Sequence, residues 1–246
     1  MNSKVALVTG GSRGVGAATA LRLARDGFDV AVTYVQGKEA AEEVVRRVEA
    51  LGRRGLAVRA DSADAGEAAD AVSLTTERLG RHGRLDVLVN NAGIGVLGPL
   101  ESLTLADVDR VLAVNVRGVF LVSQAAAPVM DAGSRIVTIG TCMTKYVPGP
   151  GGTLYAMSKS ALIGLTKALA RELGARGITA NIVHPGPIDT DMNPADGPYA
   201  SGQAEMTALG RFGTADEVAR TVAYLAGPAA AYVTGAELAV DGGHAA

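Results

Sequence analysis

Val5-Ala6-Leu7-Val8-Thr9-Gly10-Gly11-Ser12-Arg13-Gly14-Val15-Gly16 joins a short apolar run, which favours a buried strand, to a glycine-rich turn. Good helix formers follow over residues 17–24, so the turn leads directly into a helix. Small residues in such a turn let the backbone approach a ligand, and free amides at the helix N-terminus face an anion. The spacing Gly10-x-x-x-Gly14-x-Gly16 differs from the common G-x-G-x-x-G, and 32 glycines in 246 residues make a chance cluster the alternative. The strand-to-helix junction nevertheless favours a phosphate-binding turn.

Strand-like and helix-like segments alternate along the rest of the chain. The predicted strands are residues 5–9, 28–34, 55–60, 85–90, 134–140, 178–184 and 236–240. The predicted helices are residues 14–26, 38–52, 64–79, 105–130, 154–173 and 214–225. This alternation predicts an α/β fold: a three-layer, Rossmann-type doubly wound parallel sheet of about seven strands, with helices on both faces. Because no linker or repeat divides the chain, we expect a single dinucleotide-binding and catalytic domain over residues 1–246.

Composition narrows the class of protein. A formal net charge of −2 gives no support for nucleic-acid or membrane-surface binding, which favour basic patches. The single cysteine, Cys142, cannot form an internal disulfide, which fits a reducing cytoplasm. The chain starts almost directly with a strand, so we expect no signal peptide, and we expect no apolar run long enough to cross a bilayer. The three histidines lack metal-ligand spacing. We therefore predict a cytoplasmic protein without metal, nucleic-acid partner or membrane.

Ligands of doubly wound sheets bind beyond the C-terminal ends of the strands, so the residues there indicate the cofactor. An NAD site would place an acid after the second strand, but residues 32–36 contain none, and Asp29 lies at the wrong end. Arg13 in the glycine turn and Lys38 at the start of the next helix instead fit a 2′-phosphate, with Tyr34 beside them. The sequence therefore favours NADP(H) as cofactor. The alternative is that Arg13 is an ordinary surface arginine.

Polar residues also follow the third and fourth strands. Asp61 and Ser62 are placed to accept from an adenine amino group, although an N-cap role is nearly as well supported. Asn90-Asn91-Ala92-Gly93 offers small residues and amides where a ribose can lie close. Side-chain amides that tie neighbouring strands together are an equally physical interpretation of this run. Residues 193–209 have the weakest pattern, and we interpret them as a mobile substrate loop with a short helix.

The chemistry is expected after the fifth strand. Tyr155 and Lys159 stand four residues apart at the start of a helix, so phenol and ammonium point to the same side. A tyrosine titrates near ~10 in water, and a nearby ammonium is expected to lower that pKa towards neutrality. Thr141, at the end of the fifth strand, offers a hydroxyl that can hydrogen-bond a reacting carbonyl. A tyrosine–lysine pair at this spacing is common by chance, so its context decides the interpretation.

Five motifs, in order, provide that context: Thr9-Gly10-x-x-x-Gly14-x-Gly16, Asn90-Asn91-Ala92-Gly93, Asn115, Tyr155-x-x-x-Lys159 and Pro185-Gly186-Pro187-Ile188-x-Thr190. The chain resembles the short-chain dehydrogenase/reductase family in its single-domain, Rossmann-type branch. It is similar in particular to bacterial 3-oxoacyl-carrier-protein reductase-like members. The resemblance runs from Lys4 to Val240-Asp241-Gly242-Gly243, which is nearly the whole chain.

The resemblance implies a role for each matching residue. Tyr155 is similar to the general acid/base of the family, and Lys159 to the lysine that holds the nicotinamide ribose and lowers the tyrosine pKa. Asn115 resembles the helix asparagine that holds a water of the proton relay. The family tetramer implies a homotetramer in which the helices of residues 105–130 and 154–173 pack across interfaces. The expected cofactor-binding residues are Gly10, Ser12, Arg13, Gly14, Val15, Gly16, Tyr34, Lys38, Asp61, Ser62, Asn91, Ala92, Gly93, Tyr155, Lys159, Pro185, Gly186, Ile188 and Thr190.

One position departs from the family pattern. A serine is usual after the fifth strand, where this chain has Thr141; its extra methyl narrows the site and restricts χ1. The glycine- and proline-rich loop before Tyr155 makes Thr144 and Thr153 weaker candidates for the same position. Cys142 fits a small buried residue better than a nucleophile. His184 fits a packed residue at a strand end better than a cofactor contact.

Two hypotheses follow. The first is an NADP-dependent reductase that transfers hydride between NADP(H) and a ketone or 3-oxoacyl substrate, with Asn115, Thr141, Tyr155 and Lys159 as catalytic residues. The second is a non-catalytic nucleotide-binding regulator on the same fold, because Asp189-Thr190-Asp191-x-Asn193-Pro194 resembles a segment of cyclic-di-nucleotide-binding dispersal proteins. The retained tyrosine, lysine and asparagine favour the enzyme. A hydrolytic or metal-dependent enzyme lacks a triad or ligand set in this sequence.

Overall fold

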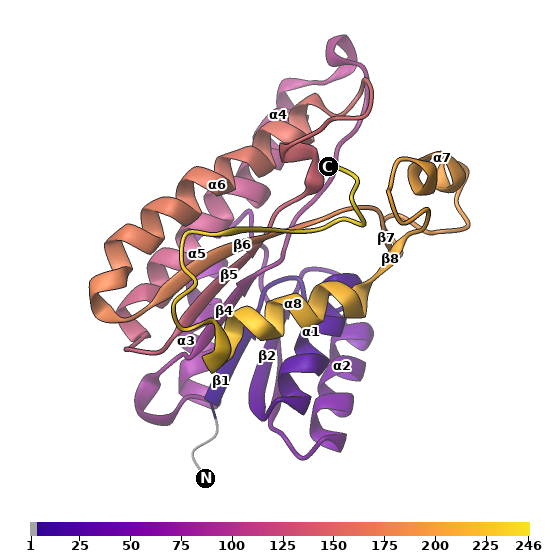
Figure 1. Ribbon diagram of the computed structural model, residues 1–246. Coiled ribbons are helices and arrows are strands. Elements are labelled where there is room, and N and C mark those ends of the chain that lie inside the picture. The colour runs from indigo at the N-terminus through magenta and orange to yellow at the C-terminus, as the bar shows by residue number, and fades with distance from the viewer. Residues whose placement is uncertain (1–3) are drawn as a thin grey trace.

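The computed structural model describes residues 4–246, and its centre is a seven-stranded sheet in the order β3-β2-β1-β4-β5-β6-β9 (Figure 1). Every neighbouring pair of strands in this sheet is parallel. The predicted three-layer, Rossmann-type fold with about seven strands is therefore confirmed. The strands are β1 (Lys4–Val8), β2 (Phe28–Tyr34), β3 (Gly55–Arg59), β4 (Val87–Asn90), β5 (Arg135–Ile139), β6 (Thr179–Pro185) and β9 (Glu237–Val240).

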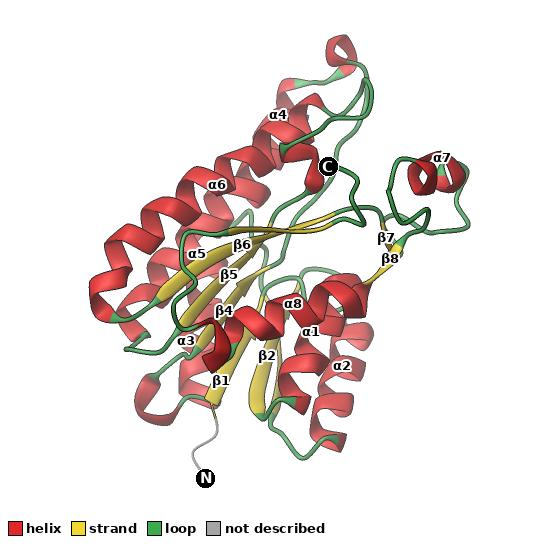
Figure 2. Cartoon of the chain, viewed as in Figure 1, coloured by secondary structure: helices red, strands yellow, loops and turns green. Residues whose placement is uncertain are grey.

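Helices cover both faces of the sheet, as Figure 2 shows. They are α1 (Gly14–Arg25), α2 (Lys38–Ala50), α3 (Ala65–Arg78), α4 (Leu105–Leu112), α5 (Val119–Ala126), α6 (Thr153–Leu173), α7 (Ala200–Glu205) and α8 (Ala215–Ala226). Helices α1, α2 and α8 share one core with the sheet, and α3, α5 and α6 share the other. The central strand shows how the sequence divides between them: Ala6 and Val8 belong to the first core, Val5 and Leu7 to the second. Successive side chains of a strand point to opposite faces, so an unbroken apolar run fills both layers.

The winding direction reverses at β1, which pairs with β2 on one side and with β4 on the other. In sheets of this type a ligand crevice opens at such a switch point, beyond the C-terminal ends of the strands. The glycine turn after β1 and the polar run after β4 both lie at this point. The fold therefore brings together two of the motifs that the sequence places 80 residues apart.

A second, two-residue pairing encloses the segment predicted to be a mobile loop. Strands β7 (Ile188–Asp189) and β8 (Gly213–Thr214) are parallel, and an antiparallel bridge joins Thr190 to Asn193. Between them lies α7, the short helix expected from the sequence, which projects from the body of the molecule in Figure 1. Strands this short carry no periodic signal, so the sequence did not predict them. The mobility of residues 193–209 stays a prediction.

The helical stretch Leu105–Val129 corrects one expectation. By its 25 residues and its composition it is long and apolar enough to cross a membrane, so the prediction that no such run exists is wrong on that criterion. It buries Val111 and Asn115 inside this fold, and its second half packs on α3. A core helix of a globular domain passes the same test. Residues Ala113–Gly118, in its middle, form a π-helical segment that periodicity did not predict.

Candidate active site

The glycine turn after β1 has no room for larger side chains. Gly10 and Gly14 have φ of +62° and +54°, the left-handed region that glycine tolerates. A Cβ on Gly16 would overlap the carbonyl oxygen of Gly10 and lie 2.5 Å from Nδ2 of Asn91. The first turn of α1 has no side-chain cap, so its amides stay available to an anion. This cradle of backbone fits the pyrophosphate of a dinucleotide.

The two cations near this turn are not equivalent. Arg13 stands at the N-cap of α1, and its side chain is exposed. Lys38 opens α2 but lies 3.6 Å from the carboxylate of Glu42, one turn along the same helix. Lys38 therefore has an ion-pair partner, the exposed Arg13 borders the glycine turn, and Tyr34 is half-buried at the end of β2. Contact of these residues with a 2′-phosphate stays a prediction.

Asn91 serves as the structural tie that one reading of the sequence expected. Its Nδ2 donates to the carbonyl oxygens of Thr9 and Gly10, and both hydrogen bonds are 2.9 Å long. The hydroxyl of Thr9 in turn accepts the N–H groups of Asn91 and Ala92 at 3.0 Å. These bonds fasten the end of β4 to the glycine turn. Contact of the same residues with a ribose stays a prediction.

Asp61 and Ser62 do not cap the following helix. Asp64 is the N-cap of α3 and accepts the N–H of Glu67 at 2.9 Å, whereas Asp61 accepts the N–H of Ala63 at 2.8 Å in a local turn. The N-cap interpretation is therefore wrong for both residues. The carbonyl of Ser62 packs so closely on Gly118 that a Cβ there would overlap it.

Lys159, Asn115 and Gly93 converge from three elements. The Lys159 side chain is buried, at 4% exposure, and its Nζ donates to the carbonyl oxygen of Ile139 over 2.9 Å. A Cβ on Gly93 would lie 3.1 Å from Nζ of Lys159 and 3.3 Å from Oδ1 of Asn115. A Cβ on Gly95 would lie 3.9 Å from Cδ2 of the Tyr155 ring. The loop after β4 therefore lines the cluster that α6 and the π-helical segment supply.

The amide of Asn115 is held at both ends. Its Oδ1 accepts the N–H of Ile94 at 2.8 Å, and its Nδ2 donates to the carbonyl of Ile94 at 2.9 Å and to Oγ of Ser158 at 3.0 Å. π-helical turns are frequent at functional sites because the extra residue redirects a side chain. Sequence reasoning missed Ser158, which lies inside the Tyr155–Lys159 motif and is fully buried.

Thr141 meets Tyr155 at the end of β5. Burial raises the pKa of the Tyr155 phenol, and the buried side chain of Thr141 lies close enough to oppose part of that shift. Thr144, a weaker candidate, instead turns its hydroxyl to the carbonyl of Thr141 at 3.0 Å, and Thr153 is an exposed residue at the start of α6. Burial is the main cause that raises the pKa of Cys142 to about 11, as fits a packed thiol.

The electrostatics of the tyrosine differ from the sequence expectation. Burial raises the pKa of Tyr155 above its usual value, and Thr141, rather than Lys159, opposes that shift. Burial also lowers the pKa of Lys159 to about 8. The expectation that Lys159 lowers the tyrosine pKa is therefore wrong in this structure. The i, i+4 spacing places the two side chains on one side of α6, but the Lys159 ammonium is bonded to Ile139.

The segment after β6 reaches the glycine turn. A Cβ on Gly14 would lie 3.4 Å from the methyl of Thr190, so Thr190 packs against the turn. Gly186 lies against the backbone of Asp241, where a Cβ would come within 2.6 Å, and Ile188 is buried. His184 is buried as well, which confirms the packed interpretation. The turns after β1, β4, β5 and β6 thus lie together beyond the C-terminal ends of the strands, as the motif order implied.

Comparison with known proteins agrees with this geometry. A family model described as enoyl-(acyl carrier protein) reductase matches residues 10–245. The chain is 44% identical over 239 residues to the cyclic-di-GMP-binding biofilm dispersal mediator protein of Escherichia coli (strain K12), covering 97% of this chain and 96% of that protein. It is 42% identical over 246 residues to a 3-oxoacyl-(acyl-carrier-protein) reductase of a Synechocystis strain, covering 99% and 97%. A short chain dehydrogenase from Burkholderia cenocepacia J2315, solved in complex with NADP, superposes with a TM-score of 0.96 at 54% identity and covers 99% of this chain and 98% of that one.

The chain belongs to the short-chain dehydrogenase/reductase family. Within that family it is an NADP-dependent oxidoreductase that acts on a small-molecule substrate.

Proposed function

We propose that the protein is a carbonyl reductase that interconverts a ketone or 3-oxoacyl substrate and its secondary alcohol. The observation that carries this proposal is the convergence of Lys159 and Asn115 at Gly93 and of the Tyr155 ring at Gly95, with the buried Thr141 side chain close to the phenol. NADPH supplies the hydride when it is bound. The proposed cofactor contacts are the residues predicted from the sequence, and Gly10, Gly14, Gly16 and Thr190 already form a cradle of suitable shape.

Each catalytic side chain has a proposed task. Tyr155 donates its proton to the substrate oxygen during reduction and takes it back during oxidation. The hydroxyl of Thr141 stabilises the oxyanion that develops on the same atom. A raised pKa suits Tyr155 as a proton donor in reduction, because the phenol stays protonated at neutral pH. Lys159 and Asn115, both fixed to backbone carbonyls, hold the ribose and the water of the proton relay.

The test is NADPH consumption with a panel of activated ketones and β-ketoesters. We expect turnover by the wild type, and a loss of at least about a thousandfold in kcat for Tyr155→Phe with NADPH affinity retained. Tyr224→Phe, an exposed tyrosine on α8, is the control and should keep full activity. Equal activity of wild type and Tyr155→Phe would contradict the proposal.

A second candidate, a non-catalytic nucleotide-binding regulator, is supported by the similarity to the dispersal mediator protein. Calorimetric titration with cyclic-di-GMP separates it from the enzyme. Tight cyclic-di-GMP binding without ketone reduction would favour the regulator. Turnover without such binding would favour the reductase.

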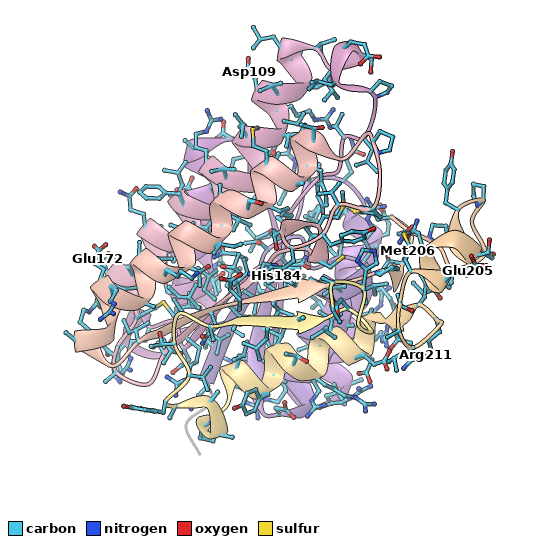
Figure 3. All side chains as sticks on the ribbon, turned by 45° about the horizontal axis from the view of Figure 1, so that its top comes forward. Asp109, Glu172, His184, Glu205, Met206 and Arg211 are labelled. Atoms are coloured by element: carbon cyan, nitrogen blue, oxygen red, sulfur yellow. The ribbon has the colours of Figure 1, made fainter. Side chains whose placement is uncertain are left out.

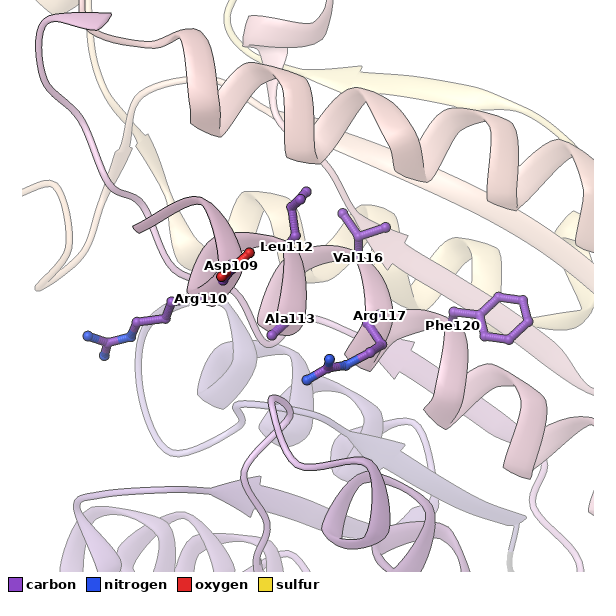
Figure 4. Close-up of a pocket in the computed structure, with 7 residues that line it drawn as sticks. All are labelled: Asp109, Arg110, Leu112, Ala113, Val116, Arg117 and Phe120. Atoms are coloured by element: carbon purple, nitrogen blue, oxygen red, sulfur yellow. The ribbon is translucent and has the colours of Figure 1, made fainter. Parts of the chain in front are cut away.

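We propose a cytoplasmic homotetramer in which a second copy packs on the outer side of α4 and α5. A groove of about 820 Å³ lies there (Figure 4), lined by Asp109, Arg110, Leu112, Ala113, Val116, Arg117 and Phe120. Phe120 on α5 is 49% exposed, and Leu105 at the start of α4 is 74% exposed. Phe120→Asp should lower the mass measured by analytical ultracentrifugation, whereas Tyr224→Phe should not. An unchanged mass for Phe120→Asp would argue against this interface.

A further inference from the structure

A buried histidine lies directly behind Thr141. His184 on β6 is 2% exposed and lies in the interior of the molecule (Figure 3). Its Nδ1 lies 3.0 Å from the carbonyl oxygen of Thr141 and 3.3 Å from the backbone nitrogen of the same residue. The hydroxyl of Thr144 is 3.3 Å from that nitrogen. Nδ1 therefore lies within hydrogen-bonding distance of both backbone polar groups of Thr141 and can bond to one of them.

The residue before Thr141 is shaped to admit this ring. A Cβ on Gly140 would lie 2.5 Å from Nδ1 of His184 and 2.8 Å from its Cε1. Any larger residue at 140 would displace the imidazole. The glycine between β5 and Thr141 is thus explained by the histidine rather than by an unusual backbone angle.

The other side of the ring faces a carboxylate. Nε2 of His184 lies 3.5 Å from Oε2 of Glu237 on β9. Glu237 is held in turn by Lys145, at 2.9 Å, and by Lys167 on α6, at 2.8 Å. The half-buried carboxylate therefore connects the loop after β5, helix α6 and strands β6 and β9 through charged groups.

The protonation of the ring follows from this arrangement. Burial is the main cause that lowers the pKa of His184, so the imidazole is neutral at neutral pH. In either neutral tautomer Nδ1 can make one hydrogen bond to the Thr141 backbone: a protonated Nδ1 donates to the carbonyl oxygen at 3.0 Å, and an unprotonated Nδ1 accepts the N–H at 3.3 Å. Glu237 faces the opposite nitrogen, so the ring lies between the Thr141 backbone and this carboxylate.

We propose that His184 is a positioning residue for Thr141, oriented by Glu237, and that it sets the direction of the threonine hydroxyl in the reaction. The β-branch of threonine restricts χ1, so the position of the Thr141 backbone determines where Oγ1 points. This inference rests on the proposed reductase function, because it acts through the hydroxyl that meets Tyr155 and the substrate oxygen.

A double-mutant cycle tests the proposal with the full chain and the best ketone substrate. His184→Phe keeps a ring of similar size without its nitrogens, and we expect kcat to fall by about tenfold to a hundredfold with the KM for NADPH unchanged. His184→Asn, which restores a polar group near Nδ1, should recover part of the loss. In a Thr141→Ala background the same changes should have no further effect on kcat. Val183→Ala, a buried neighbour that faces the other core, is the control: it should lower Tm but not kcat.

Equal losses in the wild-type and Thr141→Ala backgrounds would overturn the proposal. If the His184 variants do not fold, Glu237→Gln carries the test, and an unchanged kcat in that variant would overturn it as well. If the wild-type protein reduces no ketone, that result contradicts the proposed reductase function and leaves the role of His184 to a second measurement. In that case an absorbance titration of Tyr155, taken as wild type minus Tyr155→Phe, decides: a higher pKa in the His184 or Glu237 variant supports the proposal, and an unchanged pKa overturns it.

Discussion

The side-chain amide of Asn91 donates a hydrogen bond of 2.9 Å to the carbonyl oxygen of Gly10, so the residue after β4 holds the glycine turn against the central strand. The turn is therefore not a flexible loop that closes on a ligand. It is a preformed cradle whose shape requires glycine at position 16. A Cβ at that position would overlap both Gly10 and Asn91.

Gly16→Ala should disrupt this cradle. The added methyl forces the turn away from Asn91, and we expect NADPH affinity to fall by at least about tenfold, with a stability loss of about 1–3 kcal/mol. Fluorescence titration with NADPH and chemical denaturation measure the two effects. Gly164→Ala in α6 has open space around its Cβ position and should be neutral or stabilising. Matching behaviour of the two variants would refute the packing argument.

Arg13→Ala should weaken NADPH much more than NADH. The exposed guanidinium stands at the N-cap of α1. NADPH carries a 2′-phosphate that the guanidinium can bind, and NADH does not. We expect a loss of about tenfold or more in NADPH affinity and little change for NADH. Lys38→Ala should have a smaller effect, because Lys38 already pairs with Glu42. Equal losses for both cofactors with Arg13→Ala would remove the case for phosphate recognition by this residue.

Thr141→Ala should shift the pH profile of alcohol oxidation. Oxidation needs the phenolate of Tyr155, and the interaction with Thr141 lowers the pKa of that phenol. Its removal raises the pKa, so the rising limb of kcat moves to higher pH, and kcat falls by about a hundredfold when the oxyanion loses its donor. Thr141→Ser keeps the hydroxyl and should retain the wild-type limb. A pH–rate series on the three proteins makes the comparison; superimposable profiles would be inconsistent with a hydrogen bond that matters.

Glu237 should make the fold sensitive to acid. Lys167, with Lys145, lowers the pKa of Glu237 to about 2, below its usual 4.5. Its stabilisation is therefore present above pH 4.5 and lost as the pH falls towards 2, with an upper limit of about 3 kcal/mol. Denaturation of Glu237→Gln at pH 6 and pH 3 should show a weaker pH dependence than the wild type. Glu217 has an equally low pKa but lies at the surface, so Glu217→Gln should change the dependence much less.

The motifs and the alternating pattern were sufficient to predict the sheet, the crevice and the family. Phe28–Tyr34 is a strand with the predicted bounds, because a mostly apolar run of β-branched and aromatic residues is typical of a buried parallel strand. Contacts between distant residues had no such signal. The bond from Asn115 to Ser158, the pair of His184 and Glu237, and the π-helical segment depend on register and on side-chain direction, which a periodic pattern does not specify. The wrong prediction for the Tyr155 pKa has the same origin. The i, i+4 spacing predicted that Tyr155 and Lys159 lie on one side of α6, but it did not predict that the Lys159 ammonium donates to the carbonyl oxygen of Ile139.

The π-helical segment at Asn115 also limits how far the thermal stability of the protein can be raised without loss of activity. Deleting one residue from Ala113–Gly118 would return the helix to regular α geometry, with better hydrogen bonds. The same deletion would remove the widened turn that presents Asn115 and would break the alignment of its side chain with Ile94 and Ser158. Stability and activity are therefore in conflict at this turn, and a laboratory selection for heat resistance alone would be expected to sacrifice it.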